Sequence, residues 1–263
     1  MTKLAASMYR LAADLKIGIS FCTRLPLGSM AANEGNCIAR ASWTMPIAGA
    51  LVGLTGASVY WLGDRLWLAP QCAAMLAVAA TVLATGALHE DGLADTFDGF
   101  GGGKTRERKL EIMRDSRIGT YGVCALAVSL ILRWSALSVI AVPIPVAIAL
   151  VAAHASARAT LPVFMRLVPP ARTDGLSAQA GQPPWACVAA ASLLGALALL
   201  AGFGLAAAMI CLLLLSSAGL FLAWLTLTQI GGQTGDVLGA LEQMGEILIL
   251  LTAAALFQTR LPP

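Results

Sequence analysis

The sequence predicts an all-α integral membrane protein, a bundle of about seven transmembrane helices (six to eight) preceded by an amphipathic helix at the membrane surface. Apolar residues make up 58% of the 263 residues and charged residues only 12%, about half the charged share of a soluble domain. The mean hydropathy is +0.79. The apolar residues gather into segments long enough to cross a bilayer, and basic residues collect in alternate loops between them.

The N-terminal segment has apolar residues at helical spacing. Charges at Arg10, Asp14 and Lys16 interrupt this segment, which argues against a signal peptide. We therefore expect an amphipathic helix that lies at the membrane interface. Its apolar positions are Leu4, Met8, Leu11, Leu15 and Ile19.

Seven segments are apolar and long enough to span a bilayer, which takes about 20 residues. Only Gly202, Phe203 and Gly204 separate the fifth from the sixth, so the number of spans depends on a turn there. No soluble domain fits between the segments, and we expect one membrane-embedded domain over residues 1–263. The expected spans cover residues 42–62, 68–89, 120–141, 145–167, 185–203, 204–228 and 245–260.

The basic residues predict the orientation of the bundle. The 99–119 loop carries six Lys and Arg residues, which places it on the cytoplasmic side. Because successive spans cross the membrane in opposite directions, the N-terminus and the 166–184 and 229–244 loops then lie on the same side. All of the 17 basic residues except Arg65, Arg133 and Arg260 fall there. We therefore expect every polar motif on the cytoplasmic face.

An acidic cluster, Glu90, Asp91, Asp95 and Asp98, follows the second apolar segment. On a helix, the three aspartates share one face, whereas Glu90 points toward a different partner. Like charges this close resist joint ionisation unless a cation joins them, and carboxylate oxygens suit Mg²⁺ or Mn²⁺. The cluster therefore predicts a metal site; the alternative is a solvated helix end where acids and bases pair.

The loop after the acidic cluster is basic, which suits anionic oxygen and above all phosphate. Arg114 and Arg117 are candidates for clamping a diphosphate, and Lys104 is a further substrate-binding candidate. Anchoring of the loop to the membrane surface is an equal alternative for Arg106, Arg108 and Lys109. Together, the acids and the bases predict metal-assisted phosphoryl chemistry beside a membrane.

A second polar motif, residues 231–240, is glycine-rich, which allows phosphate to approach backbone N–H groups. Thr234 either caps the following helix or binds substrate. Asp236 has no Lys or Arg within 20 residues in the sequence, so it needs a partner from elsewhere or a metal. We include Asp236 in the expected metal site.

Several ionisable residues lie in or beside apolar segments. A basic residue inside a membrane helix faces a cavity or a carboxylate, which makes Arg158 a weaker substrate-binding candidate. We expect His154, four residues earlier, to be a polar packing residue and Arg133 to be structural. His89 adjoins the acids but has no triad partners in the sequence.

The motifs together resemble those of the cobalamin synthase family, also called adenosylcobinamide-GDP ribazoletransferases. The resemblance covers essentially the whole chain, although residues 172–184 match less clearly. It rests on HEDGLADTFDGF (89–100), RER and EIMRDSRIGTYG (106–122), GGQTGDVLGA (231–240), and two smaller elements at 23–26 and 46–49.

The resemblance implies a transferase of substituted phosphate groups in the bacterial inner (cytoplasmic) membrane, with Mg²⁺ as cofactor. Such an enzyme joins adenosylcobinamide-GDP to α-ribazole or its 5′-phosphate and releases GMP. We expect Asp91, Asp95, Asp98 and Asp236 to bind Mg²⁺, with orientation of the ribazole as the alternative role for Asp236. One of Asp91, Asp95 and Glu90 would accept the hydroxyl proton. Arg114 and Arg117 would hold the GMP phosphate.

Two other functions remain open at this point. CDP-alcohol phosphotransferases also carry spaced aspartates, but their DxxDGxxAR motif ends in Ala-Arg, whereas this chain has Asp95 in that part. A transporter is the other alternative, although transporter sites lie near the bilayer midplane on broken helices. Beyond the lipid bilayer, we expect no nucleic acid partner, and we leave open other corrinoid-assembly enzymes or a second copy of the chain.

Overall fold

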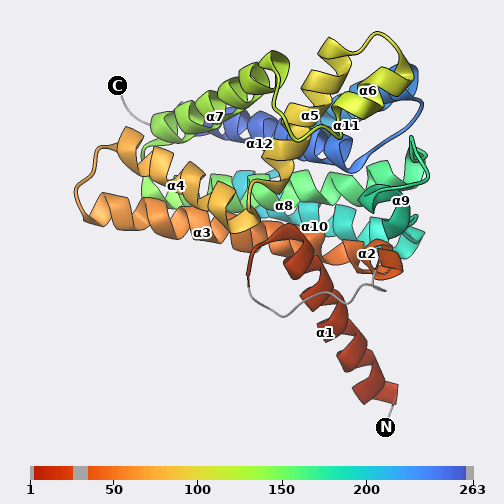
Figure 1. Cartoon of the computed structure of the whole chain (residues 1–263). Coiled ribbons are helices and arrows are strands. Elements are labelled where there is room, and N and C mark those ends of the chain that lie inside the picture. Colours follow the sequence, from red (N-terminus) through yellow and green to blue (C-terminus); the bar gives the residue numbers. More distant parts are fainter. Residues whose placement is uncertain (1–2, 26–34, 259–263) are drawn as a thin grey trace.

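The computed structural model describes residues 3–25 and 35–258 and has an all-α architecture (Figure 1). Pro26, Arg260 and the end of the seventh expected span lie outside the described residues. Along the described chain the helices are α1 (Lys3–Cys22), α2 (Gly35–Ala41), the 3-10 turn η1 (Ser42–Thr44), α3 (Met45–Arg65), α4 (Pro70–Thr85), α5 (Leu88–Gly102), α6 (Arg106–Ile112), α7 (Thr120–Ile140), α8 (Pro143–Leu167), α9 (Leu176–Ala180), α10 (Trp185–Phe203), α11 (Leu205–Ile230) and α12 (Gly235–Gln258).

The helices confirm a polytopic membrane bundle. Within the described residues, six helices are long and apolar enough to cross a membrane, and the bent pair α4 and α5 makes up to seven. The expected break between the fifth and sixth spans is present at Gly204, which has a φ of +78° between α10 and α11. The chain is therefore a multi-pass membrane protein.

The second expected span, 68–89, is wrong at its C-terminal end. Helix α4 ends at Thr85, and Gly86 and Ala87 both adopt left-handed backbone conformations. The side chain of Arg24 packs against Gly86, where an added Cβ would lie 2.1 Å from its Nε. Helix α5 then leaves at 88° to α4. The acidic cluster therefore lies on a helix of its own.

The last expected span, 245–260, begins too late. Helix α12 begins at Gly235, because Gly231, with a φ of +77°, ends α11 and Thr234 caps the next helix. Residues 235–244, expected in a loop, are helical. Asp236 therefore lies in the first turn of α12, and the buried Glu242 and Glu246 lie one turn apart inside the bundle.

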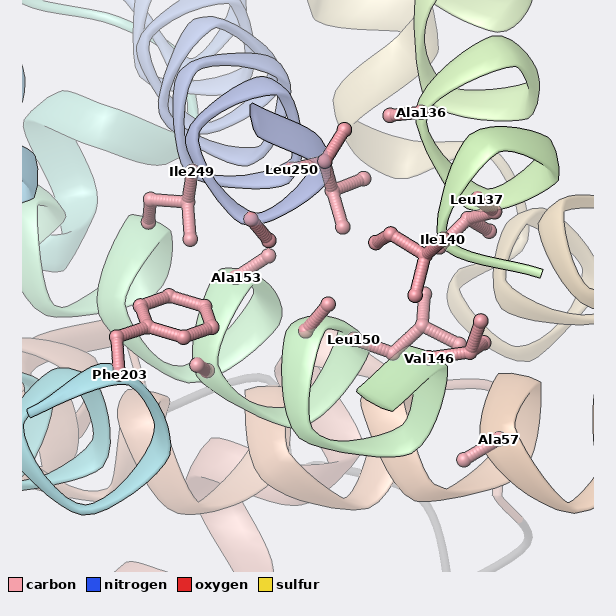
Figure 2. Packing of buried hydrophobic residues seen from close by; sticks show 14 of the residues in the cluster. Ala57, Ala136, Leu137, Ile140, Val146, Leu150, Ala153, Phe203, Ile249 and Leu250 are labelled. Atoms are coloured by element: carbon pink, nitrogen blue, oxygen red, sulfur yellow. The ribbon is translucent and has the colours of Figure 1, made fainter. Parts of the chain in front are cut away.

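The core is built around α8, which packs against α3, α10 and α12. Figure 2 shows Leu150 and Ala153 of α8 facing Ile249 and Leu250 of α12. Small residues bring the backbones close: a Cβ on Gly49 of α3 would lie 2.1 Å from the carbonyl oxygen of His154. Close backbone approach is how membrane helices gain packing energy where lipid offers no hydrophobic advantage.

The expected N-terminal helix is present as α1, and its two halves differ. Its C-terminal half packs on the bundle, where Ile17 and Cys22 are buried and Asp14 accepts a hydrogen bond from Arg40. The other half projects from the body (Figure 1), with Met8 and Tyr9 exposed. Its position at the membrane interface stays a prediction.

Candidate active site

The two acidic motifs meet where α5 crosses α12. A Cβ added to Gly92 would lie 2.8 Å from the carbonyl oxygen of Asp236, and one on Gly239 would lie 3.1 Å from the Cα of Gly92. Only glycines allow this approach of two backbones. The crossing therefore brings the α5 aspartates beside Asp236, about 140 residues away in the sequence.

Three aspartates form what we call the acidic group: Asp91, Asp95 and Asp236. Asp91 is exposed, and Asp95 and Asp236 are partly buried. Asp95 is close enough to the other two for their charges to interact. The expected helical register of Asp91 and Asp95 is confirmed, since both lie on α5. Three carboxylates at one place attract a cation.

Asp98 makes contacts that its spacing did not predict, and its expected role as a metal ligand stays a prediction. Its carboxylate accepts hydrogen bonds from the backbone N–H groups of Gly119 and Gly122, at 2.7 and 2.9 Å. A Cβ on either glycine would lie within 2.5 Å of that carboxylate. Asp98 thus holds the N-terminus of α7, where a negative charge is favourable. This contact also gives a structural reason for both glycines.

A cavity of about 160 Å³ lies beside the acidic group. Two of its polar residues, Arg172 and Ser177, come from the segment around α9, to which no catalytic role was given from the sequence. The polar residues that line it are His89, Asp91, Arg172, Ser177 and Asp236. The apolar residues that line it include Phe21, Ile38, Met45, Leu161, Met165 and Leu238.

Thr234 supports Asp236 at the edge of this cavity. Its hydroxyl accepts the N–H of Val237 at 3.3 Å and donates to the Asp236 carboxylate at 3.0 Å. The side chain is buried, so the capping role accounts for Thr234 without direct substrate contact. The basic partner of Asp236 is Arg172, which is distant in the sequence. The Arg172 Nη2 atom lies 3.8 Å from the Asp236 Oδ2 atom.

A buried charge network, Glu90, Arg133, His154, Arg158, Glu242 and Glu246, lies next to the acidic group. Arg133 donates to Glu90 at 3.0 Å and to Glu246 at 3.2 Å. As expected, Glu90 points to a partner other than the aspartates. Charges inside a membrane helix bundle are tolerated when each is paired, as they are here.

Arg158 belongs to this network and does not line the cavity. Only 1% of its side chain is exposed, and its Nη1 atom lies 2.5 Å from Glu242 and 3.0 Å from Glu246. The sequence predicted that Arg158 faces either a cavity or a carboxylate, and the structure shows that it faces carboxylates. His154 contacts Glu246 and Arg158, which confirms its polar packing role.

His154, Glu242 and Glu246 also bring possible metal-ligand atoms within 4.8 Å of one another. The guanidinium groups of Arg133 and Arg158 already neutralise these carboxylates. A divalent cation would add to that positive charge, so we assign no metal to this group.

His89 joins the cavity to the buried charge network. Its Nδ1 lies 3.3 Å from the Arg158 Nη2 and 3.8 Å from the Glu242 carboxylate. A guanidinium only donates hydrogen bonds, so this contact assigns a lone pair to Nδ1 and the proton of a neutral ring to Nε2. Both partners are distant in the sequence, which is why sequence reasoning gave His89 little weight.

The basic residues after α5 hold loops together. Arg114 pairs with Asp174 at 2.5 Å, and Arg106 donates to the carbonyl oxygen of Ala171 at 2.7 Å. Arg117 pairs with Asp115 and holds the pKa of that exposed carboxyl at about 2.

The three residues of this run that were expected to bind substrate do not line the cavity. Lys104, Arg114 and Arg117 are exposed and take no part in the cavity wall.

Comparisons with known proteins show which family the chain resembles over nearly its whole length. The family model of cobalamin-5-phosphate synthase matches residues 14–254. Adenosylcobinamide-GDP ribazoletransferase of Bradyrhizobium diazoefficiens is 63% identical over 92% of this chain and 94% of its own. The enzymes of the same name from Mesorhizobium japonicum and Ralstonia nicotianae are 52% and 41% identical, over 97% and 94% of this chain and 97% and 96% of their own.

No solved structure matches the chain. The family match covers the acidic motif, the α7 cap, the segment around α9 and most of α12. On this match and the full-length relatives, the chain belongs to the cobalamin-5-phosphate synthase family.

Proposed function

We propose that this protein transfers the adenosylcobinamide phosphate moiety from adenosylcobinamide-GDP to α-ribazole or its 5′-phosphate, and releases GMP. The names of its full-length relatives support the reaction. The observation that carries it is the crossing of α5 and α12, which brings Asp91 and Asp236 onto the wall of one cavity, with Asp95 one turn along α5 from Asp91. The product would be adenosylcobalamin or its 5′-phosphate.

The reaction is the attack of a ribose hydroxyl on a diphosphate. In such transfers the protein contributes mainly by positioning the reactants and neutralising charge, and less by forming covalent bonds to them. The cavity is lined by both polar and apolar residues. This combination suits an acceptor that has a polar ribose and an apolar base.

We further propose that Asp91, Asp95 and Asp236 hold Mg²⁺. The donor set is made of carboxylates, the hard oxygen ligands that Mg²⁺ prefers. These carboxylates do not close into a tight cage, since the one group of three described ligands within 4.8 Å is His154, Glu242 and Glu246. An open set suits Mg²⁺, which keeps several waters and binds through a few carboxylates and substrate phosphates.

When bound, Mg²⁺ would supply neutralisation of the negative charge on the diphosphate. Asp98 is left out of the ligand set because its carboxylate binds the α7 N-terminus. We assign acceptance of the hydroxyl proton to Asp91 or Asp95. Glu90 is less suited, because it is buried and its carboxylate is paired with Arg133.

We place the reaction on the cytoplasmic side of the bacterial inner membrane. The bacterial sources of the relatives support this membrane. The side is supported by the basic segments next to the cavity, since Arg106 and Arg114 contact the chain just before α9.

The experiment that tests the function is GMP release by the detergent-purified protein, supplied with adenosylcobinamide-GDP and α-ribazole, with and without Mg²⁺. We expect GMP and a cobalamin product that require both substrates and Mg²⁺. Folded protein that releases no GMP would contradict the proposal. Turnover of a CDP-linked donor, or uptake of labelled precursor into sealed vesicles, would then identify one of the alternative functions.

A further inference from the structure

Resting on the proposed function for the identity of the substrate, we infer that Arg172 is a phosphate-binding residue of this cavity. It would bind the diphosphate of adenosylcobinamide-GDP opposite the acidic group. The basic run at residues 104–117, which the sequence favoured for this task, lies outside the cavity wall.

The guanidinium of Arg172 has unused hydrogen-bonding capacity. Its Nη1 atom is buried and has no hydrogen-bond partner among the described residues. Its Nη2 atom lies 3.8 Å from Asp236 Oδ2, too far for a hydrogen bond, and that oxygen already accepts the Thr234 hydroxyl. A buried donor without an acceptor is costly, and a ligand oxygen would supply one.

The backbone around Arg172 is held rigidly in front of α12. Residues 169–171 pair with Gln233 through two backbone hydrogen bonds of 2.8 Å. Arg106 donates to the carbonyl oxygen at the end of this stretch, and Ser177 donates to the Gln233 side chain at 2.7 Å. Arg172 is thereby preorganised beside the cavity, which lowers the entropy cost of binding.

Charge explains why a fixed cation is needed at this position. The acidic group repels a diphosphate, and among the described residues that line the cavity only Arg172 carries a guanidinium. Arg158 lies close by but is already paired with Glu242 and Glu246. The planar fork of Arg172 matches two phosphate oxygens, a geometry that a lysine ammonium does not offer.

Arg172 is only 19% exposed, so it reaches the cavity without facing bulk solvent. Burial strengthens its attraction for an anion, because less water screens the charge. The inferred ligand class is therefore a diphosphate ester whose phosphates enter between Arg172 and the acidic group, with the adjoining group against the apolar lining residues.

The test is equilibrium binding of adenosylcobinamide-GDP to the full-length protein in neutral detergent with EDTA, so that no metal contributes. We expect Arg172→Gln to weaken binding by about 10- to 100-fold, as loss of charged hydrogen bonds does. Arg172→Lys should recover only part of this loss. Arg108→Gln is the matched control, because that exposed arginine pairs with Glu111 on its own helix and does not line the cavity.

Adenosylcobinamide without the GDP should bind the wild type and Arg172→Gln alike, which shows that the variant cavity is folded. Equal affinity of Arg172→Gln and Arg108→Gln for adenosylcobinamide-GDP would overturn the inference. So would recovery of affinity in Arg172→Gln/Asp236→Asn, because Arg172 would then serve only to neutralise Asp236.

Turnover separates this inference from the proposed function. If the wild type binds the ligand through Arg172 but releases no GMP, the phosphate site stands and the reaction is wrong. If the wild type releases GMP and Arg172→Gln keeps both its affinity and its KM, the reaction stands and the phosphate site is wrong.

Discussion

Gly92 of α5 and Gly239 of α12 meet backbone to backbone, at a distance where a Cβ on Gly239 would lie 3.1 Å from the Cα of Gly92. This contact brings together motifs from the two halves of the chain. It places Asp236 beside Asp91 and Asp95, and it positions His89 between the cavity and the buried charge network.

The first prediction concerns this crossing. Gly239→Ala should separate α5 from α12 and lower kcat/KM by at least about tenfold, because small displacements of reacting groups are costly. GMP release measures the effect. Gly219→Ala on α11 is the control, since an added Cβ there meets nothing within 4 Å. If Gly239→Ala keeps full activity, the crossing does not position the site.

The second prediction separates the roles of the aspartates. Asp91→Asn should lower turnover by about 10²-fold or more, as loss of a group acting on the reacting atoms does. Asp98→Asn should instead destabilise the protein by about 1 kcal/mol, because it weakens the α7 cap.

Titration of activity with Mg²⁺ in both variants distinguishes the two roles. The Mg²⁺ concentration for half-maximal activity should rise for Asp91→Asn and stay the same for Asp98→Asn. The exposed Asp64 at the end of α3 supplies the control Asp64→Asn. If this Mg²⁺ concentration rises strongly in Asp98→Asn but not in Asp91→Asn, Asp98 is a metal ligand after all.

The third prediction concerns the buried charge network. Arg133→Met leaves Glu90 and Glu246 without the guanidinium that pairs both, and should destabilise the protein by about 3–5 kcal/mol. Thermal unfolding in detergent measures this loss. Adding Glu90→Gln should restore part of it, because one unpaired charge is removed. No difference between Arg133→Met and the wild type would show that the network contributes little.

Local patterns were enough to predict the fold class, most of the spans and the helical face shared by Asp91 and Asp95. Hydropathy and residue spacing depend on neighbours along the chain, so the sequence carries this information directly. The match of the motifs to a known family likewise rests on contiguous residues. The separation of α10 from α11 at Gly204 could be predicted because it also depends on residues that are adjacent in the sequence.

Only the tertiary structure decided which of the charged residues share a site. Arg24 packs against the turn at Gly86, Asp98 binds the α7 N-terminus, and Arg158 pairs with carboxylates on α12. Arg172 reaches Asp236 from 64 positions away. These outcomes depend on which helices touch, and contacts between distant parts of a chain leave no periodic signal in its sequence.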